Sequence, residues 1–150
     1  MLYTLIGAVL FGADTIIKQQ VEKKLDFTDE IPILKGKAFL TKYHNKGAFL
    51  DLGEKRPRLT QFIGIVMTLF CLLFYILSFG NVKTTEIMKA GMGILLGGAF
   101  SNSMDRLTRQ YVVDYLKFNV KNKRLSRIVF NISDFGIMLG VLLALGGAFD

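Results

Sequence analysis

The chain has 150 residues, one domain by length, and its 51% hydrophobic and 21% charged residues lie in separate stretches, as in membrane proteins. One cysteine and one histidine exclude a disulfide framework and a cysteine or histidine cage for a metal, so we expect no metal and no cofactor. The net charge of +7 comes from basic residues beside apolar runs, without a nucleic-acid recognition motif, which favours contact with the phospholipid bilayer and not with nucleic acid.

Four apolar runs predict four membrane spans, at about 1–20, 59–79, 87–104 and 130–149, within a single domain that covers 1–150. The run at 59–79 has no charged residue and has about the length that crosses the hydrocarbon core. The run at 87–104 is rich in Gly and Ala, and Gly93 and Gly97 have the spacing that allows close helix packing. The predicted fold class is therefore a membrane all-α bundle of four transmembrane helices.

Two connecting segments, 37–53 and 111–120, show the alternation of apolar and polar residues that is typical of strands. We expect them to form a small β-element at the membrane surface. The connectors 21–58 and 107–129 hold nine and six Lys or Arg, against two in the short loop after the second span. A positive-inside count therefore places both long connectors in the cytoplasm.

Ionisable side chains inside the spans need an explanation, because a charge at the bilayer centre costs roughly 2.5–3.5 kcal/mol on insertion scales. Asp14 and Lys18 are four residues apart on one helix face, where they form a local ion pair, a polar surface inside the bundle, or both. Asn102, Asp105 and Arg106 also share a face. They form either a self-contained hydrogen-bonded network or a group that orients a neighbouring carboxylate.

Asp114 and Asp134 lie at span boundaries without a cation nearby in the sequence. Asp114 stands between apolar residues in VVDY, and Asp134 follows Asn131 by three residues at the start of the last span. Each carboxylate is either exposed to lipid head groups or kept for chemistry. Because no Ser or Cys stands in a recognisable nucleophile setting, the available chemistry is hydrolysis by paired carboxylates that share a proton.

Several motifs follow one another along the chain. DTIIK contains Asp14 and Lys18, HNKGAF contains Asn45, Gly47 and Ala48, and GGAFSNSMDRLTRQYVVDY is followed by FNISD. Over nearly its full length the sequence resembles the bacterial lipoprotein signal peptidases, or type II signal peptidases, a family of globomycin-sensitive membrane aspartyl proteases. The resemblance implies that Asp114 and Asp134 are the catalytic pair. It implies a supporting or substrate-binding role for Asp14, Lys18, Asn45, Gly47, Ala48, Asn102, Asp105, Arg106 and Asn131.

The resemblance also implies a substrate and a location. The substrates are prolipoproteins whose lipobox Cys already carries diacylglycerol, and a monomer that globomycin-type inhibitors block cuts them just before that Cys. The enzyme is a multi-pass protein of the bacterial cytoplasmic (inner) membrane, with both termini in the cytoplasm and with the active site and β-element on the outer surface. That orientation opposes the positive-inside count, and we follow the resemblance, with the basic connectors lying against anionic lipid.

Ser101, Tyr115 and Ser133 depart from the family motifs, which have Gly, Phe and Ala at these positions. Two other functions stay open: a catalytically silent paralogue that binds lipoproteins or lipids, and a small ion or proton carrier. The presence of both Asp114 and Asp134 favours the enzyme over the paralogue. The acids gather towards one membrane face and 59–79 has none, which favours the enzyme over the carrier.

Overall fold

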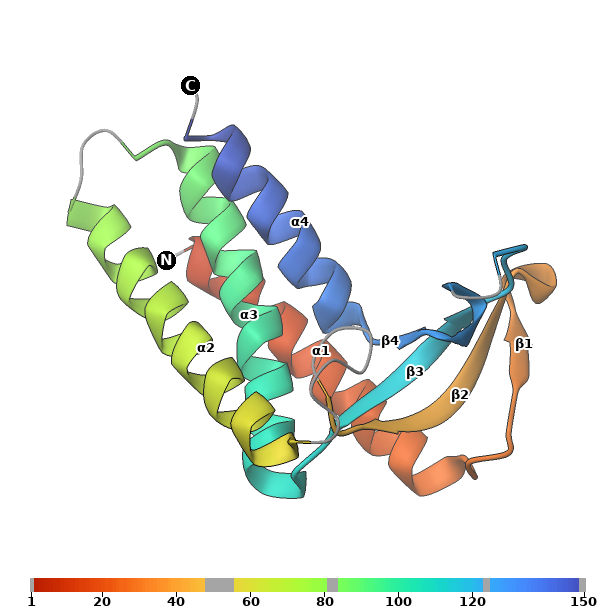
Figure 1. The fold of residues 1–150 in the computed structure, drawn as a ribbon. Helices are drawn as coiled ribbons and strands as arrows, with labels where there is room; N and C mark the ends of the chain where they lie inside the picture. Colours follow the sequence, from red (N-terminus) through yellow and green to blue (C-terminus); the bar gives the residue numbers. More distant parts are fainter. Residues whose placement is uncertain (1, 48–55, 81–83, 123–124, 149–150) are drawn as a thin grey trace.

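The computed structural model describes residues 2–47, 56–80, 84–122 and 125–148. In these residues four α-helices stand side by side, and a four-stranded antiparallel sheet lies against one end of them (Figure 1). The chain is therefore mostly helical with a small sheet. The elements in chain order are α1 (Leu2–Lys24), β1 (Ile31–Ile33), the 3₁₀ helix η1 (Leu34–Gly36), β2 (Ala38–Asn45), α2 (Pro57–Gly80), α3 (Glu86–Arg109), β3 (Val112–Phe118), the 3₁₀ helix η3 (Leu125–Arg127), β4 (Val129–Phe130) and α4 (Ile132–Gly146).

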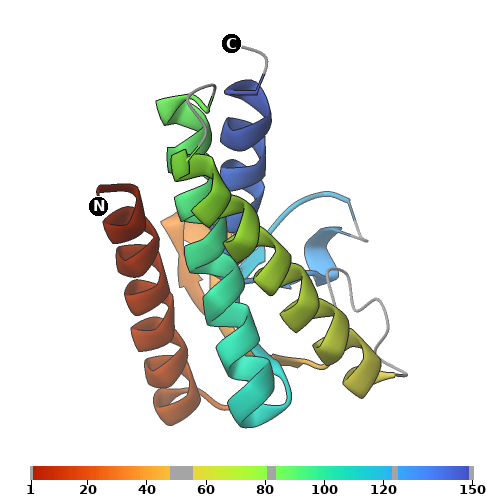
Figure 2. The ribbon, with the colours of Figure 1, turned by 90° about the vertical axis from the view of Figure 1, so that its left-hand side faces the viewer.

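Helix α3 is at the centre of the helices and packs against α1, α2 and α4 (Figure 2). Its glycines make this possible, because a side chain would not fit at the contacts. A Cβ on Gly97 would lie 2.2 Å from the carbonyl oxygen of Gly7 in α1, and one on Gly93 would lie 2.5 Å from that of Tyr3. The close packing predicted from the spacing of Gly93 and Gly97 is therefore confirmed.

Small and polar side chains fill much of the space between the helices, around a small apolar cluster of Tyr75, Met92 and Leu96, whereas many large apolar side chains face outward. On α2 the outward residues include Phe62, Phe70, Leu73 and Phe74, each more than half exposed. This pattern suits a lipid environment, in which apolar surface needs no burial in protein. Among the described helices, α2 alone is both long and apolar enough to cross a membrane, with a mean hydropathy of 2.5 in its most apolar stretch. Helix α4 is apolar but has 15 residues.

The helices lie where the spans are expected, but their ends differ from the expected ones. Helix α3 continues to Arg109, past the expected end at 104, and polar residues on both sides of that point, such as Asn102 and Asp105, are buried and do not end the helix. Helix α1 likewise continues to Lys24. Helix α4 begins at Ile132 and not at 130, since Asn131 caps its first turn; it ends at Gly146, and the expected end at 149 lies outside the described residues. Pro57, which lies in the 21–58 connector and before the expected span, is the first residue of α2. The N–H of a first helical residue makes no hydrogen bond within the helix, so proline costs none there.

The strands are ordered β1-β2-β3-β4, and both segments that were expected to form strands contribute to this sheet. One extra residue in β2 changes its register with β3: Leu40 pairs with Leu116, but Tyr43 pairs with Asp114. The bulge places Asn45 two residues beyond the partner of Asp114, on the same face of the sheet. Without the extra residue, His44 would take that position. The bulge thus determines which side chain of β2 can reach Asp114.

Candidate active site

Asp114 and Asp134 are brought together where the sheet meets α4. Leu116 of β3 pairs with Phe130 of β4, and Asn131 follows directly before α4 begins. Asn131 Nδ2 lies 2.6 Å from Asp114 Oδ1, and its main-chain N lies 3.0 Å from Asp134 Oδ2. The same residue therefore donates a hydrogen bond to each of the two carboxylates.

The start of α4 is a capping box, in which the side chains of Asn131 and Asp134 each accept a hydrogen bond from the other residue's main-chain N–H. Asn131 Oδ1 accepts from the main-chain N of Asp134 at 3.0 Å, while the Asp134 carboxylate accepts from the main-chain N of Asn131. Because a main-chain N–H can only donate, it must face Asn131 Oδ1. The amide NH₂ of Asn131 is therefore directed to Asp114.

Asn45 and Asn102 are oriented in the same way. Asn45 Oδ1 accepts from the main-chain N of Gly47 at 2.9 Å, and Asn45 Nδ2 donates to Asp114 Oδ2 at 2.9 Å. Asn102 Oδ1 accepts from Lys18 Nζ at 2.9 Å, and Asn102 Nδ2 donates to Asp134 Oδ1 at 2.9 Å. An obligate donor fixes each amide, so the carboxylates face NH₂ groups and not carbonyl oxygens.

A cavity of about 620 Å³ opens in front of this pair, between α2, α3, α4 and the sheet. Asp114 and Asp134 both line it, together with Asn45, Asn102 and Arg106. The rest of its lining is largely apolar and includes Met67, Leu95, Phe130, Ile137, Met138 and Val141. The cavity therefore offers polar groups near the carboxylates and apolar surface elsewhere.

The pKa of Asp114 is far above the usual range of an aspartate. Burial raises it most, the neighbouring carboxylate of Asp134 raises it further, and it reaches about 7 although the amides of Asn45 and Asn131 act in the opposite direction. At neutral pH the pair can therefore hold one proton between two carboxylates. Such a pair can take a proton from water with one carboxylate and polarise a carbonyl group with the other.

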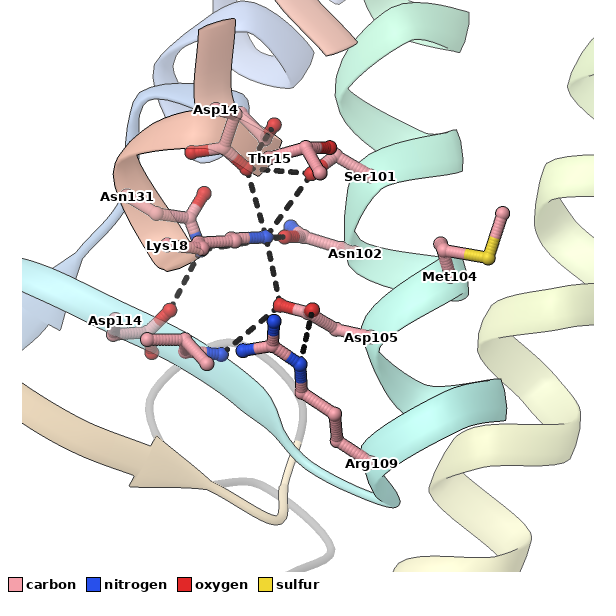
Figure 3. Close-up of polar contacts among 12 residues, drawn as sticks. Asp14, Thr15, Lys18, Ser101, Asn102, Met104, Asp105, Arg109, Asp114 and Asn131 are labelled. Carbon is pink, nitrogen blue, oxygen red and sulfur yellow. Dashed lines mark hydrogen bonds and ion pairs between the residues drawn. The ribbon is translucent and has the colours of Figure 1, made fainter. Parts of the chain in front are cut away.

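Behind the pair, Lys18 is the centre of a buried ionic network (Figure 3). Its Nζ lies 2.7 Å from Asp14 Oδ2 and 3.0 Å from Asp105 Oδ2, and Ser101 Oγ lies 3.1 Å away. Both alternatives for Asp14 and Lys18 hold, since the ion pair is local and also forms part of a polar surface that reaches α3. Asp105 in addition accepts from the main-chain N of Val113 at 3.1 Å, so it anchors the start of β3 and has no direct contact to the carboxylate pair among the described hydrogen bonds.

Arg106 contacts main-chain carbonyl groups. Its Nη1 donates to the carbonyl oxygen of Asn102 at 3.2 Å, and its Nη2 donates to that of Gly47 at 3.1 Å. It thus ties the end of β2 to α3 at the edge of the cavity. Ala48, expected beside Gly47, lies outside the described residues. Within the described ranges no three His, Cys, Asp or Glu side chains are placed to bind a metal ion.

The sequence motifs missed a set of hydroxyl groups. Ser101, Tyr115 and Ser133, noted only as departures from the family motifs, all donate hydrogen bonds to Asp14. The available signal was that three motif departures each add a hydroxyl beside a candidate site residue. Their convergence on one carboxylate depends on the tertiary fold and cannot be seen in the sequence.

Comparison with solved structures shows the fold. The chain is similar to a bacterial membrane enzyme solved by the in meso method, with a TM-score of 0.83, 20% identity, and coverage of 98% of this chain and 87% of that one. It is also similar to another structure with the same description, with a TM-score of 0.77, 20% identity, and coverage of 95% and 89%. A family model described as signal peptidase (SPase) II matches residues 6–149. With nearly the whole chain matched, it belongs to the signal peptidase II family, membrane proteases that process lipoproteins.

Proposed function

We propose that this peptidase removes the signal peptide from diacylglyceryl-modified prolipoproteins, with Asp114 and Asp134 as its catalytic residues. The observation that carries the proposal is the placement of both carboxylates in the lining of one largely apolar cavity, each held by Asn131. A lipid-modified peptide has a polar scissile bond next to apolar chains. The cavity has the same combination of polar and apolar surface.

The reaction is hydrolysis of the peptide bond before the lipidated Cys. The ionised carboxylate of the pair takes a proton from water, whose oxygen attacks the carbonyl carbon. The protonated carboxylate donates to the carbonyl oxygen and stabilises the charge that develops there. When the C–N bond breaks, the proton taken from water goes to the leaving amine. The dyad is thereby ready for another water molecule.

Asn45, Gly47 and the adjoining end of β2 would hold the substrate backbone over the pair. Asn45 already contacts Asp114, and Gly47 is linked to Arg106, so this segment is fixed on the side of the cavity next to the sheet. Ala48 belongs to the same proposed substrate-contacting segment. Asp14, Lys18, Asn102, Asp105, Arg106 and Asn131 would support the pair.

We further propose that α1, α2, α3 and α4 all span the bacterial inner membrane, with the sheet and the carboxylate pair at the outer surface. Helix α1 begins and α4 ends away from the sheet (Figure 1), which supports a common side for both termini. A reporter enzyme fused to the C-terminus should then be active in the cytoplasm. A fusion active only outside the cell would contradict this orientation.

A gel-shift assay with purified diacylglyceryl-modified prolipoprotein tests the proposed reaction. The wild-type protein should release the signal peptide, whereas Asp114→Asn and Asp134→Asn should each abolish release, because neither variant has a pair that can share a proton. Asp26→Asn is the matched control, since Asp26 is exposed and precedes the sheet. Cleavage at the wild-type rate by either dyad variant would show that the dyad assignment is wrong.

The same assay separates the enzyme from a binding protein. A protein that retains the lipid-modified substrate without releasing the signal peptide would favour the silent paralogue. Globomycin should block release by the wild-type protein. Unmodified prolipoprotein, without diacylglycerol, should not be cut at a comparable rate.

A further inference from the structure

The Asp14 carboxylate accepts hydrogen bonds from buried hydroxyl groups of elements that are distant in the sequence. Ser101 Oγ of α3 and Ser133 Oγ of α4 donate to Asp14 Oδ2 at 2.6 and 2.7 Å. The hydroxyl of Tyr115 in β3 donates to Asp14 Oδ1 at 2.7 Å. All four side chains are at most 2% exposed. We refer to Asp14, Ser101, Tyr115 and Ser133 as the Asp14 cluster.

Tyr115 links the cluster to the strand that carries Asp114. Neighbouring side chains of a strand point to opposite faces, so Tyr115 reaches Asp14 on one face while Asp114 lines the cavity on the other. The Tyr115 oxygen also accepts from the main-chain N of Ile132 at 3.1 Å, at the start of α4. Burial, and then the charge of Asp14, raise the pKa of Tyr115, so its hydroxyl stays a donor.

The two serines link the cluster to the helices that carry the other site residues. Ser133 directly precedes Asp134 in the first turn of α4. Ser101 directly precedes Asn102, whose amide donates to Asp134. Each hydroxyl of the cluster is therefore a chain neighbour of a residue that belongs to the carboxylate pair or contacts it.

We propose that the Asp14 cluster is a positioning device for the reaction: it sets the separation of the Asp114 and Asp134 carboxyl groups. The proposal rests on the function proposed above for that pair. Proton sharing requires a fixed, short separation, because the repulsion that raises one pKa of a carboxylate pair decreases with distance. The cluster supplies such a constraint, since one carboxylate holds β3, α3 and α4 at the same time.

Removing the hydroxyls, while keeping the Asp14–Lys18 ion pair, tests the proposal. Tyr115→Phe and Ser133→Ala, singly and together, are purified in detergent and assayed with diacylglyceryl-modified prolipoprotein. We expect kcat to fall about five-fold in each single variant and about twenty-fold in the double variant. A five-fold loss corresponds to part of the free energy of one hydrogen bond to a charged group. KM should stay unchanged, because these side chains do not line the cavity.

The pH profile gives a readout that a purely structural role would not change. A looser separation weakens the repulsion between the two carboxylates, so the shared proton is lost at lower pH. In the double variant, cleavage should therefore start to decline at a lower pH than in the wild-type protein. Thermal unfolding of each variant is measured in parallel.

Buried hydroxyls far from the carboxylate pair provide matched controls. Tyr75→Phe removes a hydroxyl that contacts Thr4 Oγ1 at 2.9 Å, and Ser78→Ala removes one that donates to the carbonyl oxygen of Tyr75 at 2.6 Å. Both lie in the half of α2 that is farther from the sheet (Figure 1). We expect both controls to keep the wild-type kcat and pH profile.

The proposal is overturned if the double variant keeps the kcat and pH profile of the wild type, even when it unfolds at a lower temperature. It is also overturned if the controls lose as much kcat as the cluster variants. Should the double variant fail to fold, the isosteric Tyr115→Phe variant decides by the same criteria. Cleavage by Asp114→Asn at the wild-type rate would instead refute the proposed function, and this proposal with it.

Discussion

Asn131, the residue that caps the start of α4, also contacts Asp114 in β3. Its Nδ2 lies 2.6 Å from Asp114 Oδ1, while its Oδ1 caps α4. The two roles can be separated by substitution. Asn131→Ser keeps a good helix cap but is too short to reach Asp114. We expect its thermal stability to stay close to that of the wild type. Its rate of prolipoprotein cleavage should fall about 10- to 100-fold, the range of a hydrogen bond to a charged group.

Asn131→Ala is the comparison variant, because it removes both the cap and the contact to Asp114. It should lose as much activity as Asn131→Ser and, in addition, about 1 kcal/mol of stability. Equal activity of Asn131→Ser and the wild-type protein would contradict a role of this amide in the reaction. Thermal unfolding and the gel-shift assay on the same preparations provide both measurements.

Cleavage should depend on pH in a way set by Asp114. Its pKa is raised to about 7, by burial first and then by Asp134, so the pair holds a shared proton below that pH and loses it above. We therefore expect the cleavage rate to decline as the pH rises through about 7. The rate is measured from pH 5 to pH 9 with one lipid and detergent composition. A rate that stays constant to pH 9 would contradict proton sharing as the basis of catalysis.

Much of this arrangement could be predicted from the sequence, because it depends on local signals. Hydropathy predicted the positions of the helices, and alternation predicted strands around Asn45 and Asp114. The pairing of Asp114 with Asp134 came from the family resemblance that the motifs carry. The end of α3 could not be predicted by hydropathy, since Asp105, just past the expected end, is charged but buried in the fold. Inward polar residues and a true helix end have the same local composition.

The details of the site depend on long-range pairing. The bulge between Leu40 and Tyr43 determines whether Asn45 or His44 faces Asp114. No Gly or Pro in β2 indicates a bulge at this position in the sequence. The contact of Ser133 with Asp14 joins residues that are far apart in the sequence. Such contacts depend on how the helices pack against one another, and no local sequence pattern shows that packing.

Cys71 provides a chemical test of the cavity. It is the one cysteine of the chain, is partly buried, and lines the cavity beside Met67 and Thr68. A bulky maleimide attached to its sulfur would fill space that the proposed substrate needs. We expect complete modification to lower the cleavage rate at least about ten-fold, since substrate and label cannot share the space.

Cys71→Ala is the control for that experiment, and treating it with the same maleimide should change its own rate very little. Mass spectrometry reports the extent of labelling. A fully labelled wild-type protein that cuts substrate at the untreated rate would show that the substrate does not occupy this part of the cavity.

Gly97 is the position where α3 approaches α1 most closely among the glycines of that contact, and its substitution should separate the two helices. A Cβ there would lie 2.2 Å from the carbonyl oxygen of Gly7, which is main chain and cannot rotate away. We expect Gly97→Ala to lower the free energy of unfolding by about 1–3 kcal/mol, as for other overpacked sites.

Gly12→Ala is the matched control in α1, because its Cβ would have no neighbour within 4 Å. It should leave stability unchanged or raise it by about 0.5–1 kcal/mol, since alanine loses less backbone entropy in a helix. Thermal unfolding in the same detergent compares them, and equal midpoints would contradict the close packing of α1 on α3.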